Sequence, residues 1–168
     1  KLNISPADML RKTPWNIILF AFSMYVIIYG LNNIGLTDLL TQIMEPLMSG
    51  SLLLASILMG GLLSILSNIF NNHPALMVGT LTLTNMDLSP LELKVAYLAS
   101  VIGSDMGSLL FPIGTLATLM WMHIIRKGGV KFSWWKYILV TISVIPIATL
   151  FTLILLYFWV SWFFTGVL

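Results

Sequence analysis

Four long stretches of this sequence contain no charged residue, and they limit what the chain can fold into more than any other feature. They cover residues 13–37, 46–86, 106–125 and 137–168. A helix that spans a membrane needs about 20 predominantly apolar residues. The 168 residues include only eight Lys or Arg and six Asp or Glu, too few to cover the surface of a soluble domain. We therefore expect an all-α integral membrane protein.

The composition also excludes several classes of protein. With 58% apolar and 8% charged residues, the chain is neither a soluble enzyme nor a nucleic-acid-binding domain nor a disordered segment. The formal net charge of +2 comes from a few clustered basic residues and does not indicate nucleic acid. Because the chain has no Cys, it has no disulfide, thiolate metal site or Cys nucleophile. We expect no enzymatic activity and no cofactor or metal.

The first and last charge-free stretches each predict one membrane span. Residues 14–34 form the first span, with Trp15 at one interface. Residues 136–164 form the last, which is long enough to be tilted and contains Pro146 as a predicted kink. Aromatic residues at both ends of this span are interpreted as belts at the membrane surfaces. The spans belong to a single membrane domain over residues 1–168.

The second stretch is interrupted by polar residues, which predicts a re-entrant hairpin over residues 50–84. Its apolar pieces, 51–66 and 74–84, would extend about 24 Å and 16 Å at ~1.5 Å per residue, short of a hydrocarbon core of about 30 Å. Non-helical backbone at this depth is tolerated only where protein or a wet cavity surrounds it. The tip is therefore a candidate substrate-binding site, with the side chains Ser67, Asn68, Asn71, Asn72 and His73.

A second interruption predicts a broken helix over residues 91–125. Residues 91–102 predict a half-helix, and the run from Gly103 to Ser108 predicts the break, because its glycines, serines and Asp are unusual inside a membrane helix. Half-helix ends that meet in mid-membrane can bind a small polar solute. The polar side chains that this segment adds to the candidate site are Ser104, Asp105, Ser108 and Thr115.

Asp105 is the only acidic residue away from a predicted interface. A charged side chain at the bilayer centre costs about 2.5–3.5 kcal/mol on insertion scales, and such residues usually mark an ion or proton path. We therefore predict that Asp105 carries a coupling proton. A helix cap or a buried hydrogen-bond partner is its alternative role. His73 is equally compatible with substrate binding and with packing of the tip.

Basic residues predict how the chain is oriented. Arg11 and Lys12 precede the first span, and residues 126–136 connect the broken helix to the last span with four basic side chains. The positive-inside rule places both groups on the cytoplasmic side of the cell membrane, with the C-terminus outside. The first span and the broken helix provide the even number of crossings that this requires, and the re-entrant hairpin adds none.

Both interruptions resemble the signatures of a known family. Residues 66–77, LSNIFNNHPALM, and residues 102–117, IGSDMGSLLFPIGTLA, are similar to signatures of the ArsB-type arsenite efflux permeases. The resemblance extends from about residue 14 to the end of the chain. It implies that the chain is one inverted repeat, the C-terminal one, of an ion-transporter-superfamily fold. That repeat contains a re-entrant helical hairpin and a broken transmembrane helix.

The resemblance also implies a function. Permeases of this family export arsenite and antimonite from the cytoplasm, driven by the proton gradient or by a separate ATPase subunit. The implied partners are membrane lipid, the arsenite or antimonite substrate, the ATPase subunit and an N-terminal repeat outside this chain, but no nucleic acid. Two alternatives stay open. One is a sodium/proton antiporter or other ion or dicarboxylate carrier of the same superfamily, and the other is a non-transporting membrane fragment that assembles with a partner.

The predicted orientation can be tested by cysteine labelling, because the native sequence contains no Cys. In the variant Asp87→Cys, the new thiol should react with a membrane-impermeant reagent added to intact cells. In Gly129→Cys, within the basic connection, the thiol should react only after the membrane has been opened. The reverse labelling pattern would invert the predicted topology.

Overall fold

The computed structural model describes residues 15–130 and 133–165. Within these ranges every regular element is an α-helix, which confirms the predicted all-α class. Arg11, Lys12 and Lys131, on which the predicted orientation partly rests, lie outside the described residues. The helices are α2 (Trp15–Asn33), α3 (Leu36–Met48), α4 (Leu52–Phe70), α5 (Asn72–Thr84), α6 (Pro90–Gly107), α7 (Leu116–Lys127) and α8 (Trp134–Thr165).

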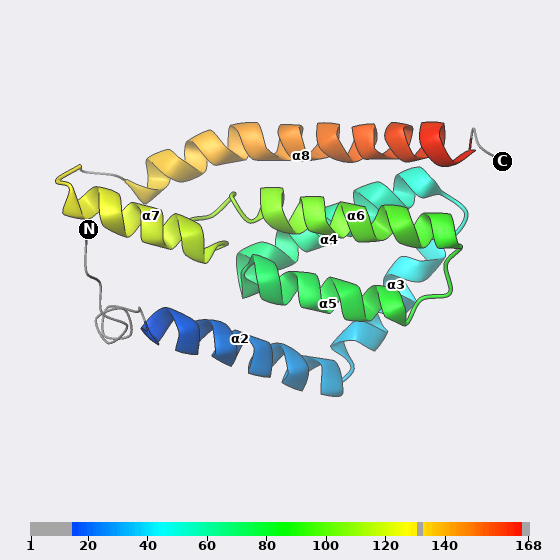
Figure 1. Ribbon diagram of the computed structural model, residues 1–168, viewed down its shortest axis with the longest axis horizontal. Helices are drawn as coiled ribbons and strands as arrows, with labels where there is room; N and C mark the ends of the chain where they lie inside the picture. The colour runs from blue at the N-terminus through cyan, green and yellow to red at the C-terminus, as the bar shows by residue number, and fades with distance from the viewer. Residues whose placement is uncertain (1–14, 131–132, 166–168) are drawn as a thin grey trace, which may run out of the picture.

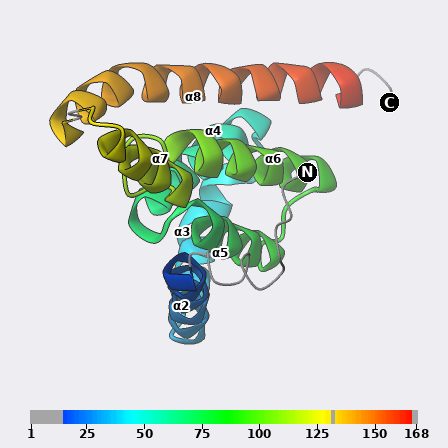
Figure 2. The ribbon, with the colours of Figure 1, turned by 60° about the vertical axis from the view of Figure 1, so that its left-hand side comes forward.

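Helix α4 lies at the centre of the fold and contacts α3, α5, α6 and α8. Figure 1 shows α8 along one side of the layer formed by α4 and α6, and α2 along the opposite side, next to α5. The view in Figure 2 shows the same order from another direction. The helices predicted as the first and last spans therefore form the two outer layers of the molecule.

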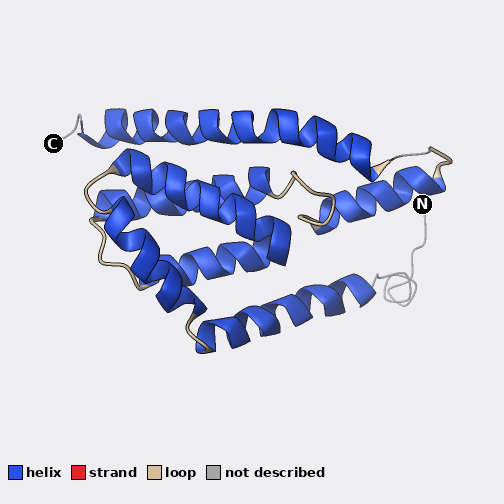
Figure 3. Cartoon of the chain, turned by 180° about the vertical axis from the view of Figure 1, so that it is seen from behind, coloured by secondary structure: helices blue, strands red, loops and turns tan. Residues whose placement is uncertain are grey.

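Helices α4 and α5 form a hairpin that turns at a single residue. Asn71 separates the two helices and has a φ of 74°, a positive value that Asn tolerates better than most residues. Pro74 follows in the first turn of α5, where a missing N–H leaves no helical hydrogen bond unmade. Figure 3 shows α5 running back along α4. The sequence predicted this turn from the same polar cluster.

The lengths of the helices refine the predicted hairpin. Helix α4 has 19 residues, about 28 Å at ~1.5 Å per residue, and is longer than the predicted piece 51–66. Helix α5 has 13 residues, about 20 Å, which is too short to cross a bilayer core. Among the described residues, α4 and α8 are long and apolar enough to span a membrane. The re-entrant path of the hairpin stays a prediction. Because α4 is long enough to span a membrane, the argument for a re-entrant path now rests on the short length of α5.

The second interruption lies further along the chain than predicted. Helix α6 continues through Gly103, Ser104 and Asp105 to Gly107, and the non-helical residues are 108–115. The prediction that the helix breaks from Gly103 to Ser108 was therefore wrong in its position. Gly103 lies inside α6 and Gly107 is its last residue, and both pack against α4.

Small residues allow α6 to approach α4 closely. A Cβ atom on Gly103 would overlap the backbone carbonyl group of Gly60, and a Cβ atom on Gly107 would overlap Ser64. The Ser64 hydroxyl donates to the carbonyl oxygens of Gly60, at 2.7 Å, and Gly103, at 3.1 Å. Small residues at this spacing are typical of membrane helices that pack backbone against backbone. The contact between α4 and α6 therefore involves main-chain atoms and the small side chain of Ser64.

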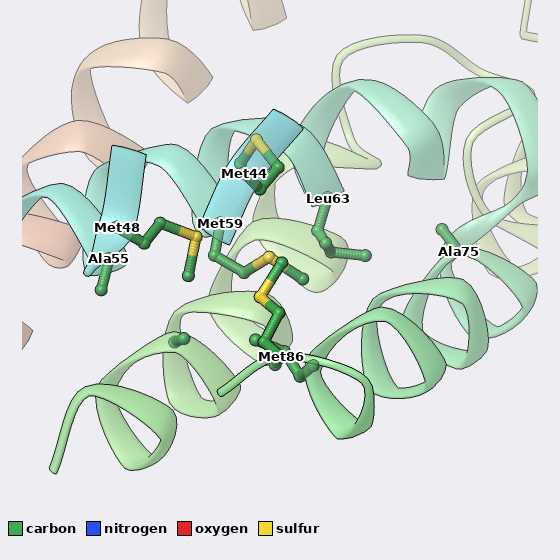
Figure 4. Packing of buried hydrophobic residues seen from close by; sticks show 9 residues of the cluster. Met44, Met48, Ala55, Met59, Leu63, Ala75 and Met86 are labelled. Atoms are coloured by element: carbon green, nitrogen blue, oxygen red, sulfur yellow. The ribbon is translucent and has the colours of Figure 1, made fainter. Parts of the chain in front are cut away.

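A cluster of methionines forms the core between α3, α4 and the segment after α5. Figure 4 shows Met44 and Met48 of α3 together with Met59 of α4 and Met86. Each of these side chains is at most 9% exposed. The flexible Met side chain fills irregular spaces between helices. These methionines are therefore packing residues.

Glu92 joins the turn between α3 and α4 to the start of α6. Its carboxylate is buried and accepts hydrogen bonds from the backbone N–H of Ser89, at 2.9 Å, and of Gly50. The Ser89 hydroxyl accepts a hydrogen bond from the N–H of Glu92, which completes a capping box at the start of α6. This structural role was not predicted from the sequence.

Helix α8 packs on α4 through one face and exposes the other. The Ser56 hydroxyl of α4 donates to the carbonyl oxygen of Leu153, at 2.8 Å. Pro146 lies inside the helix, and its ribbon bends in the N-terminal half (Figure 1). Large apolar side chains such as Ile147 and Trp162 are exposed on the outer face. That face matches the surface expected of a helix in contact with lipid.

The close contact between α4 and α6 can be tested by adding a methyl group. Gly103→Ala should destabilise the protein by about 1–3 kcal/mol, because the new atom meets backbone that cannot rotate away. Gly61→Ala is the matched control, since a Cβ atom there meets no atom within 4 Å and Ala favours a helix. The melting temperature of the detergent-solubilised protein reports the difference. Equal melting temperatures for both variants would contradict this account of the glycines.

Candidate functional site: the junction of two chain interruptions

The two interruptions predicted from the sequence meet in the structure. The backbone N–H of Asn72, the first residue of α5, donates to the carbonyl oxygen of Gly114, at 3.1 Å. The backbone N–H of Phe111 donates to Asn68 Oδ1, at 3.0 Å. A Cβ atom on Gly114 would lie only 2.8 Å from Asn68 Oδ1, so a larger residue does not fit there. The hairpin tip and residues 108–115 therefore form one interlocked junction.

Asn68 is the side chain that bridges the two interruptions. Its Nδ2 donates to the carbonyl oxygens of Ser64 and Gly107, each at 2.7 Å, and its Oδ1 accepts from Phe111. Both amide hydrogens are used within the chain, and these partners determine which way the amide points. Asn68 thus holds the end of α6 against α4. Its predicted contact with a substrate stays a prediction.

Three predicted site residues form a hydrogen-bonded group on the surface of the junction. Asn72 Nδ2 donates to Asp105 Oδ1, at 3.4 Å, and Asn72 Oδ1 lies 2.9 Å from His73 Nδ1. His73 and Asp105 are exposed, and Asn72 is half-buried. We call Asn72, His73 and Asp105 the polar trio. It is the part of the predicted site that a solute can reach.

The position of Asp105 corrects one of its two expected roles. The residue lies in the last turns of α6 and is exposed, so it is not a buried hydrogen-bond partner. It also does not cap α6, whose C-terminal cap is Ser108. The amide of Asn72 holds the Asp105 carboxylate close to the N-terminal end of α5, where the helix dipole favours a negative charge.

The buried hydroxyl groups of the predicted site are bonded within their own segments. Three serine hydroxyls donate to main-chain carbonyl oxygens three residues earlier, at 2.9–3.0 Å, and one threonine hydroxyl donates to Thr118 and accepts from its N–H to cap α7. The threonine is the N-cap of α7, and the serine bonds satisfy each hydroxyl hydrogen within its own segment. These four buried residues are Ser67, Ser104, Ser108 and Thr115. Their contacts with a substrate stay predictions.

A cavity of about 230 Å³ lies beside the junction, between α2 and the hairpin tip. Asn71, which is buried and donates from Nδ2 to the carbonyl oxygen of Ile113 at 3.4 Å, lines the cavity. His73 also lines it, so the cavity and the polar trio share this imidazole. The remaining walls are Phe20, Met24 and Tyr25 of α2, Pro74 of α5 and Leu116 of α7.

The α2 residues of this cavity were not predicted as part of the site. They lie in a uniformly apolar span, and no polar interruption marks them in the sequence. The spacing of Phe20 and Met24, one helical turn apart, was the available signal, but it fits lipid contact equally well. Only the packing of α2 on α5 brings these side chains to the hairpin tip.

The charges at the junction are few and of one sign. No Lys or Arg occurs in residues 46–86 or 95–125, and Asp105 is the single acid in those ranges. Within the described part of the chain, no three His, Asp or Glu side chains are close enough to hold a metal ion. The junction is therefore suited to a small neutral or cationic solute that donates and accepts hydrogen bonds.

A comparison with protein families matches residues 3–160 to the ArsB model, described as arsenical pump membrane protein. The chain belongs to the ArsB family. The matched range contains both signatures, residues 66–77 and 102–117. The resemblance predicted from the sequence is confirmed. The predicted association with transport and arsenical resistance is also confirmed at the level of the family, whose members are named arsenical pump membrane proteins.

Curated ArsB relatives extend well beyond this chain. A protein of Bacillus subtilis (strain 168), provisionally named as an arsenical pump membrane protein, is 58% identical over 160 residues, which are 95% of this chain and 36% of the relative. The arsenical pump membrane protein of Escherichia coli is 37% identical over 134 residues, 80% of this chain and 31% of the relative. The chain thus spans about a third of the length of these relatives. No solved structure matches it.

The bridging role of Asn68 can be tested with a side chain of nearly the same size. In Asn68→Asp the carboxylate has no hydrogen to donate, so the carbonyl oxygens of Ser64 and Gly107 face a negative charge instead of a donor. We expect a loss of about 1–3 kcal/mol of stability, measured as a lower melting temperature. Asn85→Asp, at the exposed C-terminal cap of α5, should lower the melting temperature less, because only the helix dipole opposes the new charge. An unchanged melting temperature for Asn68→Asp would show that the amide does not hold the junction together.

Proposed function

We propose that this chain is the C-terminal repeat of a permease that exports arsenite and antimonite from the cytoplasm. Membership in the ArsB family supports a membrane transporter of arsenicals. The observation that carries the proposal is the junction, in which Asn68 joins two chain interruptions while His73 and Asp105 of the polar trio are exposed. Transporters commonly bind their solutes where interrupted helices meet.

The polar trio suits the chemistry of arsenite. At neutral pH arsenite is mainly the uncharged trihydroxide, a compact molecule that both donates and accepts hydrogen bonds. The Asp105 carboxylate can accept from its hydroxyl groups, and the second ring nitrogen of His73 can donate or accept. Because the chain has no thiolate, it cannot hold the metalloid by tight sulfur bonds that would slow release.

We assign proton coupling to Asp105. It is the only acid near the junction, and the Asn72 amide connects it to His73. An ionised carboxylate only accepts hydrogen bonds, whereas a protonated one also donates. A proton and a substrate hydroxyl would therefore use the same oxygen atoms, which makes the affinity for one depend on the presence of the other.

The proposed function requires the junction to lie inside the membrane. Helix α5, at about 20 Å, and α7, with 12 residues and about 18 Å, are too short to cross alone, which supports a re-entrant hairpin and a broken helix. Residues 126–136 are then cytoplasmic and the C-terminus lies outside. The basic end of α7 and the connection between α5 and α6 lie at opposite ends of the molecule, which is consistent with this orientation (Figure 1).

We also propose that an N-terminal repeat covers the polar trio in the complete transporter. Exposed polar groups at membrane depth need water or protein partners. About two thirds of the length of the curated relatives lies outside the part that this chain matches, which supports a partner of this kind. A separate ATPase subunit is the alternative source of energy and the second proposed partner.

A sodium/proton antiporter is the second candidate function. The exposed Asp105 carboxylate has no basic partner in the described chain, and a cation could take that place. A dicarboxylate carrier is less compatible, because no Lys or Arg occurs at either interruption. Uptake assays with arsenite and with Na⁺ distinguish the two candidates.

Asp105→Asn should abolish concentrative transport while leaving downhill equilibration intact, because the amide keeps the shape of the side chain but cannot ionise. The chain is co-expressed with the complementary N-terminal part of the Bacillus subtilis relative, and arsenite uptake is measured in inverted vesicles with an imposed pH gradient. Accumulation by the variant should fall to the level seen without the gradient. Asp87→Asn, an exposed acid before α6, should accumulate arsenite like the parent.

Two outcomes would contradict this proposal. If Asp105→Asn concentrates arsenite as well as the parent protein, Asp105 has no coupling role. If the parent exchanges Na⁺ for protons but does not move arsenite or antimonite, the antiporter is the correct function.

A further inference from the structure

A shallow groove lies between the start of α6 and the end of α8, away from the polar trio. Its volume is about 480 Å³. Helix α6 contributes Leu93, Lys94 and Tyr97, and α8 contributes Trp159 and Phe164. Lys94 is the only charged residue among those that line it. Figure 1 shows this end of the molecule opposite the basic end of α7.

The positive charge of Lys94 is not neutralised in the part of the chain that the structure describes. Its ammonium lies 3.8 Å from the ring centre of Phe164, a cation–π contact that leaves N–H donors free for a further partner. Glu92, the acid nearest in sequence, is buried and accepts from the N–H groups of Ser89 and Gly50. Lys94 therefore presents an unpaired cation at the groove.

The groove combines this cation with a rim of exposed aromatic residues. Trp159 packs edge-on against Phe164, with ring centroids 6.4 Å apart, and Trp159 and Tyr97 are about half exposed. Aromatic side chains with a polar edge concentrate where a membrane meets water. Exposed apolar side chains such as Leu155 continue from the groove along α8. The surface thus changes from cationic to apolar along one line.

We propose that this groove binds one anionic phospholipid, with its phosphate at Lys94 and its acyl chains along α8. The negative headgroup complements the unpaired ammonium, and the apolar walls complement the chains. A peptide segment fits less well, because the groove offers few polar groups for a backbone that must be hydrogen-bonded in the membrane. The site does not depend on the proposed transport function, since Lys94 lies in the second turn of α6 and the polar trio lies at its other end.

Native mass spectrometry of the purified full chain tests the site. The protein is mixed with phosphatidylglycerol or with phosphatidylcholine of the same acyl chains. We expect one tightly bound phosphatidylglycerol, with about a fivefold preference over phosphatidylcholine, the effect expected of one basic residue near a membrane surface. Lys94→Gln should remove the preference and Lys94→Arg should keep it. Lys127→Gln is the control, because it removes the same charge from the last turn of α7.

Equal binding of the two lipids by the parent, or an unchanged preference in Lys94→Gln, would overturn the proposal. Displacement of the lipid by soluble glycerophosphate would also overturn it, because the site would then bind phosphate alone. In vesicles, brominated phosphatidylglycerol should quench tryptophan fluorescence, and Trp159→Phe should lower the quenched fraction. If it does not, another part of the protein covers the groove and the lipid assignment is wrong.

Discussion

The close approach of α4 and α6 is the contact on which the rest of the structure depends. Gly103 lies against the backbone of Gly60, and Gly107 lies against Ser64, with no room for a Cβ atom at either glycine. Apolar burial does not drive helices together in lipid, so close packing and interhelical hydrogen bonds must do so. This contact brings the ends of α4 and α6 within reach of one amide, that of Asn68, which joins them.

The junction shows how a membrane protein tolerates two interruptions in its helices. Buried polar groups need partners inside the protein, because the hydrocarbon core offers none. Ser67, Ser104 and Ser108 meet this need with nearby carbonyl oxygens, and Asn68 meets it across two segments. The groups left for a solute are those at the surface, above all His73 and Asp105. Most polar residues at the two interruptions are therefore already hydrogen-bonded within the protein, and only a few remain to bind a solute.

Helix α6 connects the two surfaces for which we propose ligands. Its N-terminal end is held by the buried carboxylate of Glu92 and exposes Lys94 beside Phe164. Its C-terminal end is held by Asn68 and exposes Asp105 beside Asn72. At each end one polar side chain, Glu92 or Asn68, holds the helix through hydrogen bonds to main-chain groups, and one exposed charged group lies nearby. The lipid and solute sites thus share one rigid element.

The sequence by itself determined the all-α class of the protein, a polar turn that includes Asn71, and the existence of two interruptions, since charge, apolar length and Pro74 act locally; it did not predict helix α3. It did not determine where α6 ends, because Gly103 and Gly107 look like helix breakers until Gly60 and Ser64 are packed against them. Nor could it separate Asn68 from the similarly polar Asn72. Asn68 and Asn72 have the same side chain, so their polarity is known from the sequence. Whether that side chain is already hydrogen-bonded within the protein depends on residues distant in sequence, and only the tertiary structure determines which residues are its neighbours.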